Sequence, residues 1–352
     1  MKALILKTTF FTAPFALLYL FCLLFYSNTE TPDLLRLGSI PNLDENYHQK
    51  FEFRQNVKYD SISNVLYSIN KKKKYTILTI GDSFSEQENL GYKNFLAQNF
   101  SVLHIDRFIS NNQIQTLINL LNGDFFDKYD IKYVILQNVE RLTIENVKNI
   151  SLQDKMTLSQ IDSLIKLRND KYKQINKKDT KQDFFSKRTI KFPLYDFPKF
   201  LFSENYLSDN SVFNVEINSE LFSNNLSKLL FLNYDLVQST QNNNLKNIDS
   251  LNIVLNIISQ KLSQRNISLI FLPSPDKYDL YYEFIVDKDS FTKPVFFDIM
   301  KNTKKEYIYI DSKEILLSQI EKKDLYFYDD THWSPISAEI IANKIQDIIQ
   351  NR

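Results

Sequence analysis

Residues 75–85 read YTILTIGDSFS, and this stretch determines how the rest of the chain is interpreted. Its first six residues are apolar or β-branched, which predicts a short buried strand. Gly81 follows directly, in a chain with four glycines where average usage would give about 25. We therefore expect Gly81 to allow a tight turn after the strand, with Ser83 presented where a helical segment begins.

Short strands and helices alternate on both sides of this turn. Such alternation predicts an α/β fold, a three-layer αβα arrangement whose mostly parallel sheet is covered by helices on both faces. The last helix is expected to begin with Ser334 as N-cap and Pro335 in its first turn. Further strands are expected at 101–105, 131–136, 267–272 and 307–310, with helices over 114–121 and 251–262.

The alternation is lost between about 142 and 243, where the sequence is polar and carries aromatic clusters such as 191–200. A structureless loop of this size is implausible, so we expect a large, partly helical insertion. Such an insertion would reach over the carboxyl edge of the sheet, where ligands bind. The segment 28–70 is expected to be a polar connector, and the α/β domain to span 71–352.

Residues 8–26, TTFFTAPFALLYLFCLLFY, contain no charged side chain. As a helix they span about 29 Å, close to the hydrocarbon thickness of a bilayer. Lysines precede them and acidic residues follow, which places the N-terminus in the cytoplasm. We expect residues 1–27 to form a cytoplasmic stub and a single-pass anchor in the cytoplasmic (inner) membrane, with the remainder in the periplasm or cell exterior. A cleaved signal peptide is the main alternative, and a buried soluble helix is the other.

The composition excludes several other classes. Forty-three basic residues balance 42 acidic ones, which argues against a nucleic-acid binder. The single cysteine, Cys22, excludes an internal disulfide framework and a cysteine-built zinc site. Only three histidines are present, which leaves little material for a polyhistidine metal centre. We expect no metal and no cofactor. His48 and His104 are expected to be surface or strand-end residues.

Ser83 is the candidate nucleophile. A catalytic serine needs a nearby base and fixed N–H donors that face the developing oxyanion. A sharp strand-to-helix turn supplies exposure of the hydroxyl and converging amides. The other interpretation is an ordinary turn in which Asp82 or Ser83 caps the helix.

Residues 328–335, YDDTHWSP, supply the candidate base. A histidine beside carboxylates suits a general base held in one tautomer by an acid. Positions two apart face the same side of extended backbone, so Asp330 is expected to orient His332. The other interpretation is a helix N-terminus at which acidic residues favour the dipole.

Together these elements resemble the SGNH hydrolase superfamily. The 81–85 turn, the 330–335 element and Pro275-Asp276-Lys277 are more narrowly similar to the SGNH-like domain of bacterial polysaccharide O-acetyltransferases, the AlgX/AlgJ-like and DHHW families. The resemblance covers about 75–141 and 265–350. In the alginate type the Asp-x-His element precedes the serine, whereas here it follows, as in the DHHW group and ordinary SGNH hydrolases.

The resemblance implies a flavodoxin-like fold and a triad of Ser83, His332 and Asp330, with the Ser83 backbone N–H in the oxyanion hole. The common SGNH spacing Asp-x-x-His would instead select Asp329 as the acid. The acetyltransferase-like spacing Asp-x-His selects Asp330, which we favour.

Further site residues follow from the resemblance near the third strand. SGNH enzymes use an asparagine there as an oxyanion donor, so Asn138 is a candidate, although the usual Gly-x-Asn pattern is absent. Arg141 is a candidate for contact with the oxyanion or a sugar, and Gly81 lies at the same turn. A salt-bridged strand end is the alternative for the Glu140–Arg141 pair.

The function implied is O-acetyl transfer outside the cytoplasmic membrane, through an acyl-serine, to an exported or cell-wall polysaccharide. Acetyl-CoA is cytoplasmic, so the resemblance implies a multi-pass membrane-bound O-acyltransferase as partner and acetyl donor. A carbohydrate esterase with the same triad is one alternative. The other is a non-catalytic glycan-binding or assembly module that uses the aromatic-rich residues 188–204.

Overall fold

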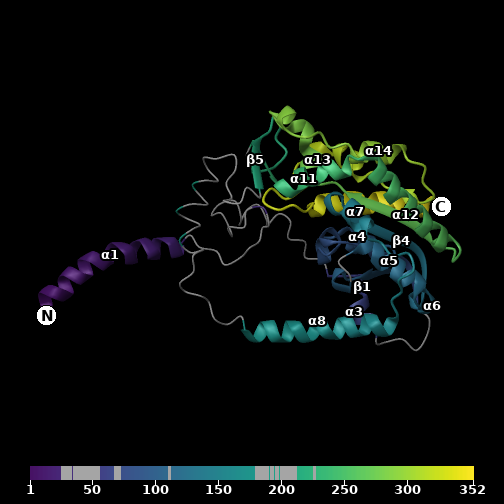
Figure 1. Ribbon diagram of the computed structural model, residues 1–352, viewed down its shortest axis with the longest axis horizontal. Helices are drawn as coiled ribbons and strands as arrows, with labels where there is room; N and C mark the ends of the chain where they lie inside the picture. Colours follow the sequence, from purple (N-terminus) through teal and green to yellow (C-terminus); the bar gives the residue numbers. More distant parts are fainter. Residues whose placement is uncertain are drawn as a thin grey trace.

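The computed structural model (Figure 1) describes residues 1–24, 34, 56–66, 73–109, 112–178, 190, 194, 198, 212–224 and 227–352. Helix α1 (Lys2–Leu24) lies apart from an α/β domain formed by the later elements. His48, most of the predicted connector and most of the aromatic-rich residues 188–204 lie outside the described residues.

Within the described residues, the main sheet has six strands in the order β1-β3-β2-β4-β7-β8, and every pairing is parallel. The predicted α/β fold with a mostly parallel sheet is therefore confirmed. A separate antiparallel pair has no place in this sheet. The strands of the main sheet are β1 (Asp60–Ser61), β2 (Lys73–Ile80), β3 (Val102–Ile105), β4 (Tyr129–Val139), β7 (Ser268–Ser274) and β8 (Ile308–Tyr309), and those of the pair are β5 (Val212–Glu216) and β6 (Lys228–Leu232).

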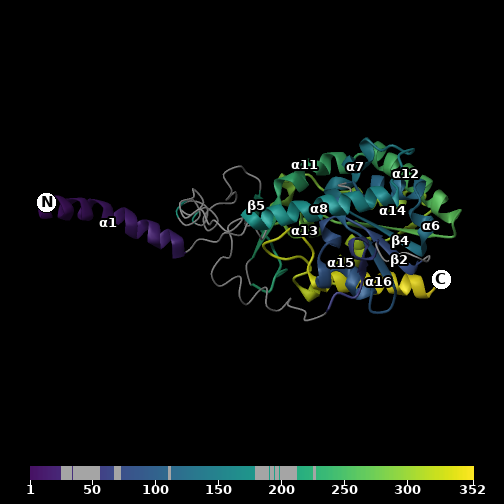
Figure 2. The ribbon, with the colours of Figure 1, turned by 90° about the horizontal axis from the view of Figure 1, so that it is seen from below.

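The sheet separates two apolar cores, because successive strand residues point to opposite faces. Ile135 belongs to one core and Leu136 to the other. Figure 2 shows α12 on one side of β2 and β4 and α16 on the other. The first core is covered by α4 (Tyr92–Leu96), α13 (Lys277–Tyr281), α15 (Ser312–Leu317) and α16 (Pro335–Gln350). The second is covered by α3 (Ile62–Val65), α5 (Gln113–Asn122), α6 (Phe125–Lys128), α8 (Leu158–Lys178), α12 (Leu245–Ser263) and α14 (Phe296–Asn302).

Further helical elements complete the described part of the chain. Helix α16 begins as predicted, because the Ser334 side chain accepts a hydrogen bond from Ile336 N and Pro335 is the first helical residue. The other helices are α7 (Glu140–Lys148) and α11 (Asn233–Asn242), with 3-10 turns η2 (Ser83–Ser85), η3 (Glu88–Leu90), η4 (Arg107–Ile109), η6 (Tyr282–Phe284), η7 (Lys288–Ser290) and η8 (Ile320–Lys322).

The structure differs from the prediction in one domain boundary and in the content of the insertion. The α/β domain begins before residue 71, because β1 pairs in parallel with β3 and extends the sheet by one strand. The insertion predicted at 142–243 contains the strand pair β5–β6 as well as helices. The ring centroid of Phe231 in β6 lies 4.9 Å from that of Tyr278 in α13, so this strand pair packs into the domain core.

Helix α1 is long and apolar enough to cross a membrane. Its large apolar side chains are exposed rather than packed against the domain, as Phe10 and Phe11 illustrate. The predicted apolar segment is thus helical over its described part, residues 8–24, and Pro14 lies inside this helix.

Candidate active site

Three parallel strands end side by side at one edge of the sheet. Ile80 pairs with Leu136, and Val139 pairs with Ser274, so β2, β4 and β7 share this carboxyl edge. The chain leaves β2 first to one side, for β3, and then crosses to the other side, for β4. Open α/β sheets bind ligands at such a change of direction. Ser83 follows β2 at this point.

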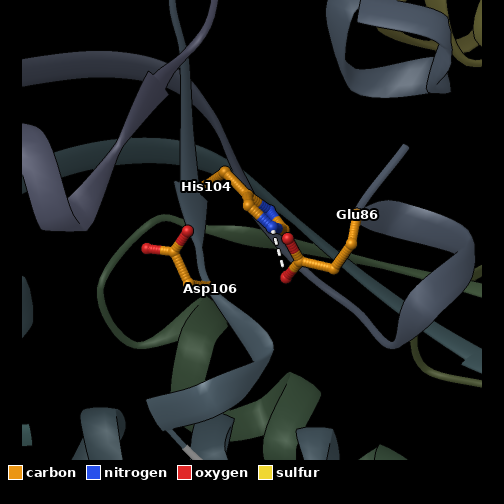
Figure 3. A group of neighbouring side chains, drawn as sticks. All are labelled: Glu86, His104 and Asp106. Carbon is orange, nitrogen blue, oxygen red and sulfur yellow. Dashed lines mark hydrogen bonds and ion pairs between the residues drawn. The ribbon is translucent and has the colours of Figure 1, made fainter. Parts of the chain in front are cut away.

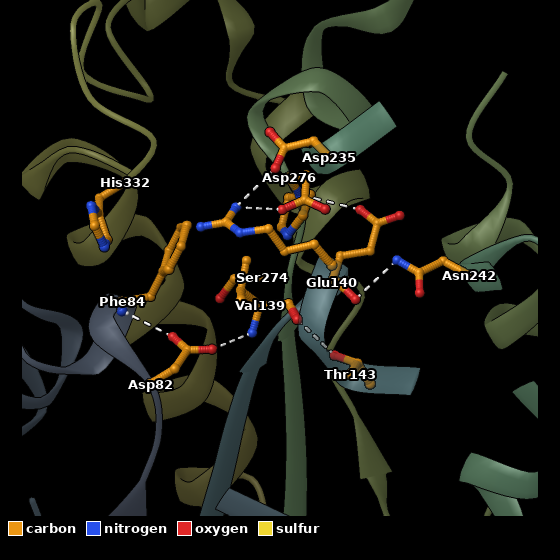
Figure 4. Close-up of polar contacts among 12 residues, drawn as sticks. Asp82, Phe84, Val139, Glu140, Thr143, Asp235, Asn242, Ser274, Asp276 and His332 are labelled. Carbon is orange, nitrogen blue, oxygen red and sulfur yellow. Dashed lines mark hydrogen bonds and ion pairs between the residues drawn. The ribbon is translucent and has the colours of Figure 1, made fainter. Parts of the chain in front are cut away.

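The turn that carries Ser83 is fixed by Asp82, a buried side chain. One carboxylate oxygen accepts a hydrogen bond from Phe84 N at 3.0 Å, and the other accepts one from Val139 N at 2.5 Å (Figure 4). Burial raises the pKa of Asp82, although both N–H donors act in the opposite direction. Asp82 is therefore the capping residue of η2, and half-buried Ser83 is the first residue of the turn.

Gly81 is needed for close approach rather than for a left-handed backbone. A Cβ at this position would lie 2.0 Å from Ser85 Oγ and 2.5 Å from Gln137 Oε1. Gln137 Oε1 accepts hydrogen bonds from Asp82 N at 3.0 Å and from Ser85 Oγ at 2.8 Å. The turn is thus held directly against β4 by Gln137, a residue that the sequence patterns did not single out.

The predicted base lies in a tight loop ahead of α16. Tyr326 and Trp333 form an antiparallel bridge across this loop. His332 Nδ1 lies 2.5 Å from Asp330 Oδ1, and the same oxygen accepts a hydrogen bond from His332 N at 2.9 Å. Because a carboxylate only accepts, Nδ1 donates, which leaves Nε2 of the neutral ring to accept a proton. Asp329 contacts the N-terminal segment, since its carbonyl accepts a hydrogen bond from Leu34 N.

Phe84 and Gln87 join the serine turn to this loop. The ring centroid of Phe84 lies 4.8 Å from that of His332 and 5.2 Å from that of Trp333, and Figure 4 shows the Phe84 ring facing His332. Gln87 Nε2 donates to Trp333 O at 2.8 Å, and Trp333 Nε1 donates to Gln87 Oε1 at 3.0 Å. Segments 246 positions apart are therefore packed together through the side chains that flank Ser83 and His332.

Arg141 forms salt bridges, as expected for the alternative of a salt-bridged strand end. Its Nη1 donates to Asp276 Oδ1 at 2.6 Å and lies 3.3 Å from Asp235 Oδ1. Burial alone would lower the pKa of Arg141, but the two carboxylates raise it instead. The guanidinium carbon is 6.0 Å from the ring centroid of Phe84. Arg141 thus supports the residue that follows Ser83, and Asp235, which belongs to the insertion, was not foreseen.

Asn138 faces away from the serine turn. Side chains alternate along β4, and Gln137 already points toward Asp82. Asn138 Nδ2 donates to Gln113 Oε1 at 3.2 Å, at the start of α5 on the opposite face of the sheet. The oxyanion-donor role predicted for Asn138 is therefore wrong on geometric grounds.

A group of buried acidic side chains lies next to Arg141 and consists of Glu140, Asp276 and Asp279. Glu140 Oε2 accepts a hydrogen bond from Asp276 N at 3.1 Å, and Lys313 Nζ lies 2.5 Å from Asp279 Oδ1. Burial raises the pKa of Glu140, and repulsion from Asp279 and Asp276 raises it further. The raised pKa of Glu140 reflects both its burial and its closeness to two other carboxyl groups.

A second polar cluster lies at the ends of β2 and β3 (Figure 3). Possible ligand atoms of Glu86, His104 and Asp106 lie within 4.8 Å of one another, a set that suits a divalent transition metal. His104 is fully buried, so the expectation of a strand-end residue was right and that of a surface residue was wrong. Its Nε2 lies 3.1 Å from Glu86 Oε1, and its Nδ1 is 2.9 Å from Thr79 Oγ1.

Internal partners already balance this cluster. Asp106 Oδ2 accepts hydrogen bonds from the Ser61 and Ser63 hydroxyls at 2.7 and 2.6 Å. Buried Lys93, with Nζ 4.2 Å from the Tyr59 ring centroid, contributes a positive charge. Burial would raise the pKa of Glu86, but the His104 hydrogen bond and Lys93 lower it to about 2. The cluster therefore has the character of a structural ionic network.

Comparison with known proteins bears on the base rather than on the serine. Residues 230–352, about a third of the chain, match a family model described as SGNH hydrolase-like domain, acetyltransferase AlgX. The matched range contains β7, Asp276 and the loop of Asp330 and His332, and it begins after the Ser83 turn. No curated protein and no solved structure matches the chain. The family match supports the predicted resemblance to SGNH-like polysaccharide O-acetyltransferases.

Proposed function

We propose, on the premise that residues 230–352 are an SGNH hydrolase-like domain of the AlgX acetyltransferase type, that this chain is a serine-dependent O-acetyltransferase. It moves an acetyl group through Ser83 to a hydroxyl of a polysaccharide outside the cytoplasmic membrane. The observation that carries the proposal is the Asp330–His332 hydrogen bond, on a ring packed against Phe84, the neighbour of Ser83.

In the first half-reaction, Ser83 Oγ attacks the acetyl carbonyl carbon while His332 Nε2 takes the hydroxyl proton. Asp330 stabilises the imidazolium that forms. The oxyanion meets the Ser83 N–H, the donor that the resemblance implies. The ester bond then breaks, and the leaving oxygen receives the proton from His332. Acetyl-Ser83 remains.

In the second half-reaction, a sugar hydroxyl attacks acetyl-Ser83 and gives its proton to His332 Nε2. The bond between the acetyl carbon and Ser83 Oγ breaks, and His332 returns the proton to Ser83. If water attacks instead, the same residues perform ester hydrolysis. Exclusion of water from the acyl-enzyme is what separates transfer from hydrolysis.

Helix α1 fits this function as a retained anchor. Lys2 and Lys7 lie at its N-terminal end, and the positive-inside tendency supports a topology with that end in the cytoplasm and the α/β domain outside. The acetyl group must then cross the membrane, because acetyl-CoA is cytoplasmic. A multi-pass membrane-bound O-acyltransferase is the class of partner that would deliver it, to a chain held nearby by α1.

The first test uses the full chain in detergent and a chromogenic acetyl ester. Ser83→Ala and His332→Ala should each lower the rate of ester cleavage by about the same large factor, because triad members act as a unit. Ser318→Ala, a change of an exposed serine in the same domain, should keep full activity. Most of the activity surviving in His332→Ala would refute the assignment of the base.

The second test adds an oligosaccharide acceptor and follows its mass. Acetylated acceptor that appears with wild type but not with Ser83→Ala supports a transferase. Ester cleavage without acceptor modification would identify a carbohydrate esterase. Absence of both activities would favour the glycan-binding module, whose aromatic-rich segment 188–204 lies mostly outside the described residues.

A further inference from the structure

Lys277 is a fully buried lysine that follows β7 and begins α13. Its Nζ donates to three main-chain carbonyl oxygens of one loop, those of Phe327 at 2.7 Å, Tyr328 at 2.6 Å and Asp330 at 3.4 Å. The aromatic ring centroid of Phe222 lies 5.1 Å away. A buried ammonium is tolerated only when it is well hydrogen-bonded, and here its three donors converge on the loop that carries the base.

The carbonyl of Asp330 is the link to the proposed chemistry. The same residue presents its carboxylate to His332 Nδ1 at 2.5 Å. The loop between the bridged residues Tyr326 and Trp333 is not part of a helix or of a longer strand, so regular backbone pairing does not fix Asp330. The ammonium supplies that restraint from just after β7, a strand that is paired on both sides, with β4 and with β8.

The residue before Lys277 acts on the other half of the site. Asp276 binds Arg141, which lies beside Phe84 in the turn that carries Ser83. Two consecutive residues just after β7 thus reach both halves of the site: Asp276 pairs with Arg141 beside Phe84, and Lys277 binds main-chain carbonyls of the base loop.

We propose that Lys277 is a positioning residue for the Asp330–His332 pair. It contacts no reacting atom and acts through the main chain of residues 327–330. The expected effect on the reaction rate rests on the proposed function. The expected effect on the position of the Asp330 carboxylate is independent of activity. Without the ammonium, the Asp330 carboxylate is no longer held at the distance at which it fixes the His332 ring.

The test measures the low-field proton resonance of the His332 Nδ1–H by NMR on the full chain in detergent, without substrate. His332→Ala assigns the signal. Lys277→Met removes the ammonium at nearly constant size. Lys313→Met is the matched control, because it removes a half-buried ion pair to Asp279 without touching the loop.

The resonance should be present in wild type and in Lys313→Met and should be lost or strongly broadened in Lys277→Met. An unchanged resonance in Lys277→Met would overturn the proposal, and so would its absence from wild type. If the chain cleaves no ester but still shows the Lys277-dependent resonance, the proposed function is refuted and this inference is supported.

The kinetic consequence separates positioning from substrate binding. Misplacement of a catalytic group by about 1 Å costs on the order of 100-fold in rate, so kcat of Lys277→Met should fall by about that factor with KM nearly unchanged. A raised KM with unchanged kcat would mean that Lys277 binds substrate instead. If Lys277→Met does not fold, Lys277→Gln keeps two N–H donors and should show a weakened resonance, and an unweakened one would overturn the proposal.

Discussion

Replacing Gln87 with alanine tests the contact that joins the two halves of the site. Gln87 lies just after the serine turn, and both polar atoms of its side chain bind Trp333, the residue after His332. These two segments lie 246 positions apart in the sequence. The Gln87 side chain is therefore expected to contribute both to stability and to the placement of the base.

The magnitude follows from the two hydrogen bonds. Each is worth about 0.5–1.5 kcal/mol net, and a buried donor left without a partner costs about 1–3 kcal/mol. Trp333 is fully buried, so water cannot readily replace Gln87 Oε1 at its indole N–H. Gln87→Ala should lower the free energy of unfolding by about 2–4 kcal/mol.

The assay is urea denaturation of the full chain in detergent, followed by tryptophan fluorescence. Trp333 is the only tryptophan of the chain, so its emission reports on the base loop itself. Acrylamide quenching under native conditions should increase in Gln87→Ala, because the loop loses its tie to the turn. Gln264→Ala, at an exposed glutamine after α12, is the matched control and should change neither quantity.

A loss of stability no larger than that of Gln264→Ala, with unchanged quenching, would refute this reasoning. It would mean that the packing of Phe84 against His332 and Trp333 suffices to hold the loop. Loss of stability without any change in ester cleavage would instead limit Gln87 to a structural role.

Two further substitutions test the surroundings of the site. Gly81→Ala should destabilise the fold by about 1–3 kcal/mol, because its Cβ would lie 2.0 Å from Ser85 Oγ, whereas Gly91→Ala, with a nearest contact of 3.4 Å, should be nearly neutral in thermal unfolding. Burial lowers the pKa of Lys93 to about 8, although nearby acids act in the opposite direction. The charged form of Lys93 therefore destabilises the folded state at neutral pH, and this destabilisation is lost as pH rises through about 8 toward 10.5. The free energy of unfolding should therefore rise between pH 7 and 9.5 more steeply in wild type than in Lys93→Met, and equal slopes in urea titrations would contradict this.

The parts of the fold that the sequence predicted are those with a strong local pattern. The strand before Gly81 and the helix that begins at Pro335 have continuous apolar runs or clear capping residues. Strand β1 has two residues, too few for any periodicity, and it exists only because β3 offers an open edge. The pair β5–β6 lies in a stretch whose overall polarity hid two short apolar runs.

The residues of the site also differ in whether the sequence predicted them. Ser83, Asp330 and His332 stand in compact motifs, and the two-residue spacing alone suggested the observed pairing of Asp330 with the ring. Gln87 and Asp235 have no distinctive neighbours in the sequence, and their roles arise from contacts with residues 246 and 94 positions away. Such long-range partners are set by the packing of the sheet and its helices, which a single sequence does not show.

The same limit explains the error at Asn138. The sequence places Gln137 and Asn138 together at the end of one strand, and either amide suits an oxyanion donor. Only the register of β4 against its neighbours decides which amide faces the serine turn. That register directs Gln137 to Asp82 and Asn138 to Gln113.

Acid quenching during turnover of the acetyl ester, followed by peptide mass mapping, tests the central assignment most directly. We expect one added acetyl group on the peptide that contains Ser83, and none in Ser83→Ala or in His332→Ala. Turnover that leaves Ser83 unmodified, or an acetyl group on another residue whose replacement abolishes cleavage, would contradict it.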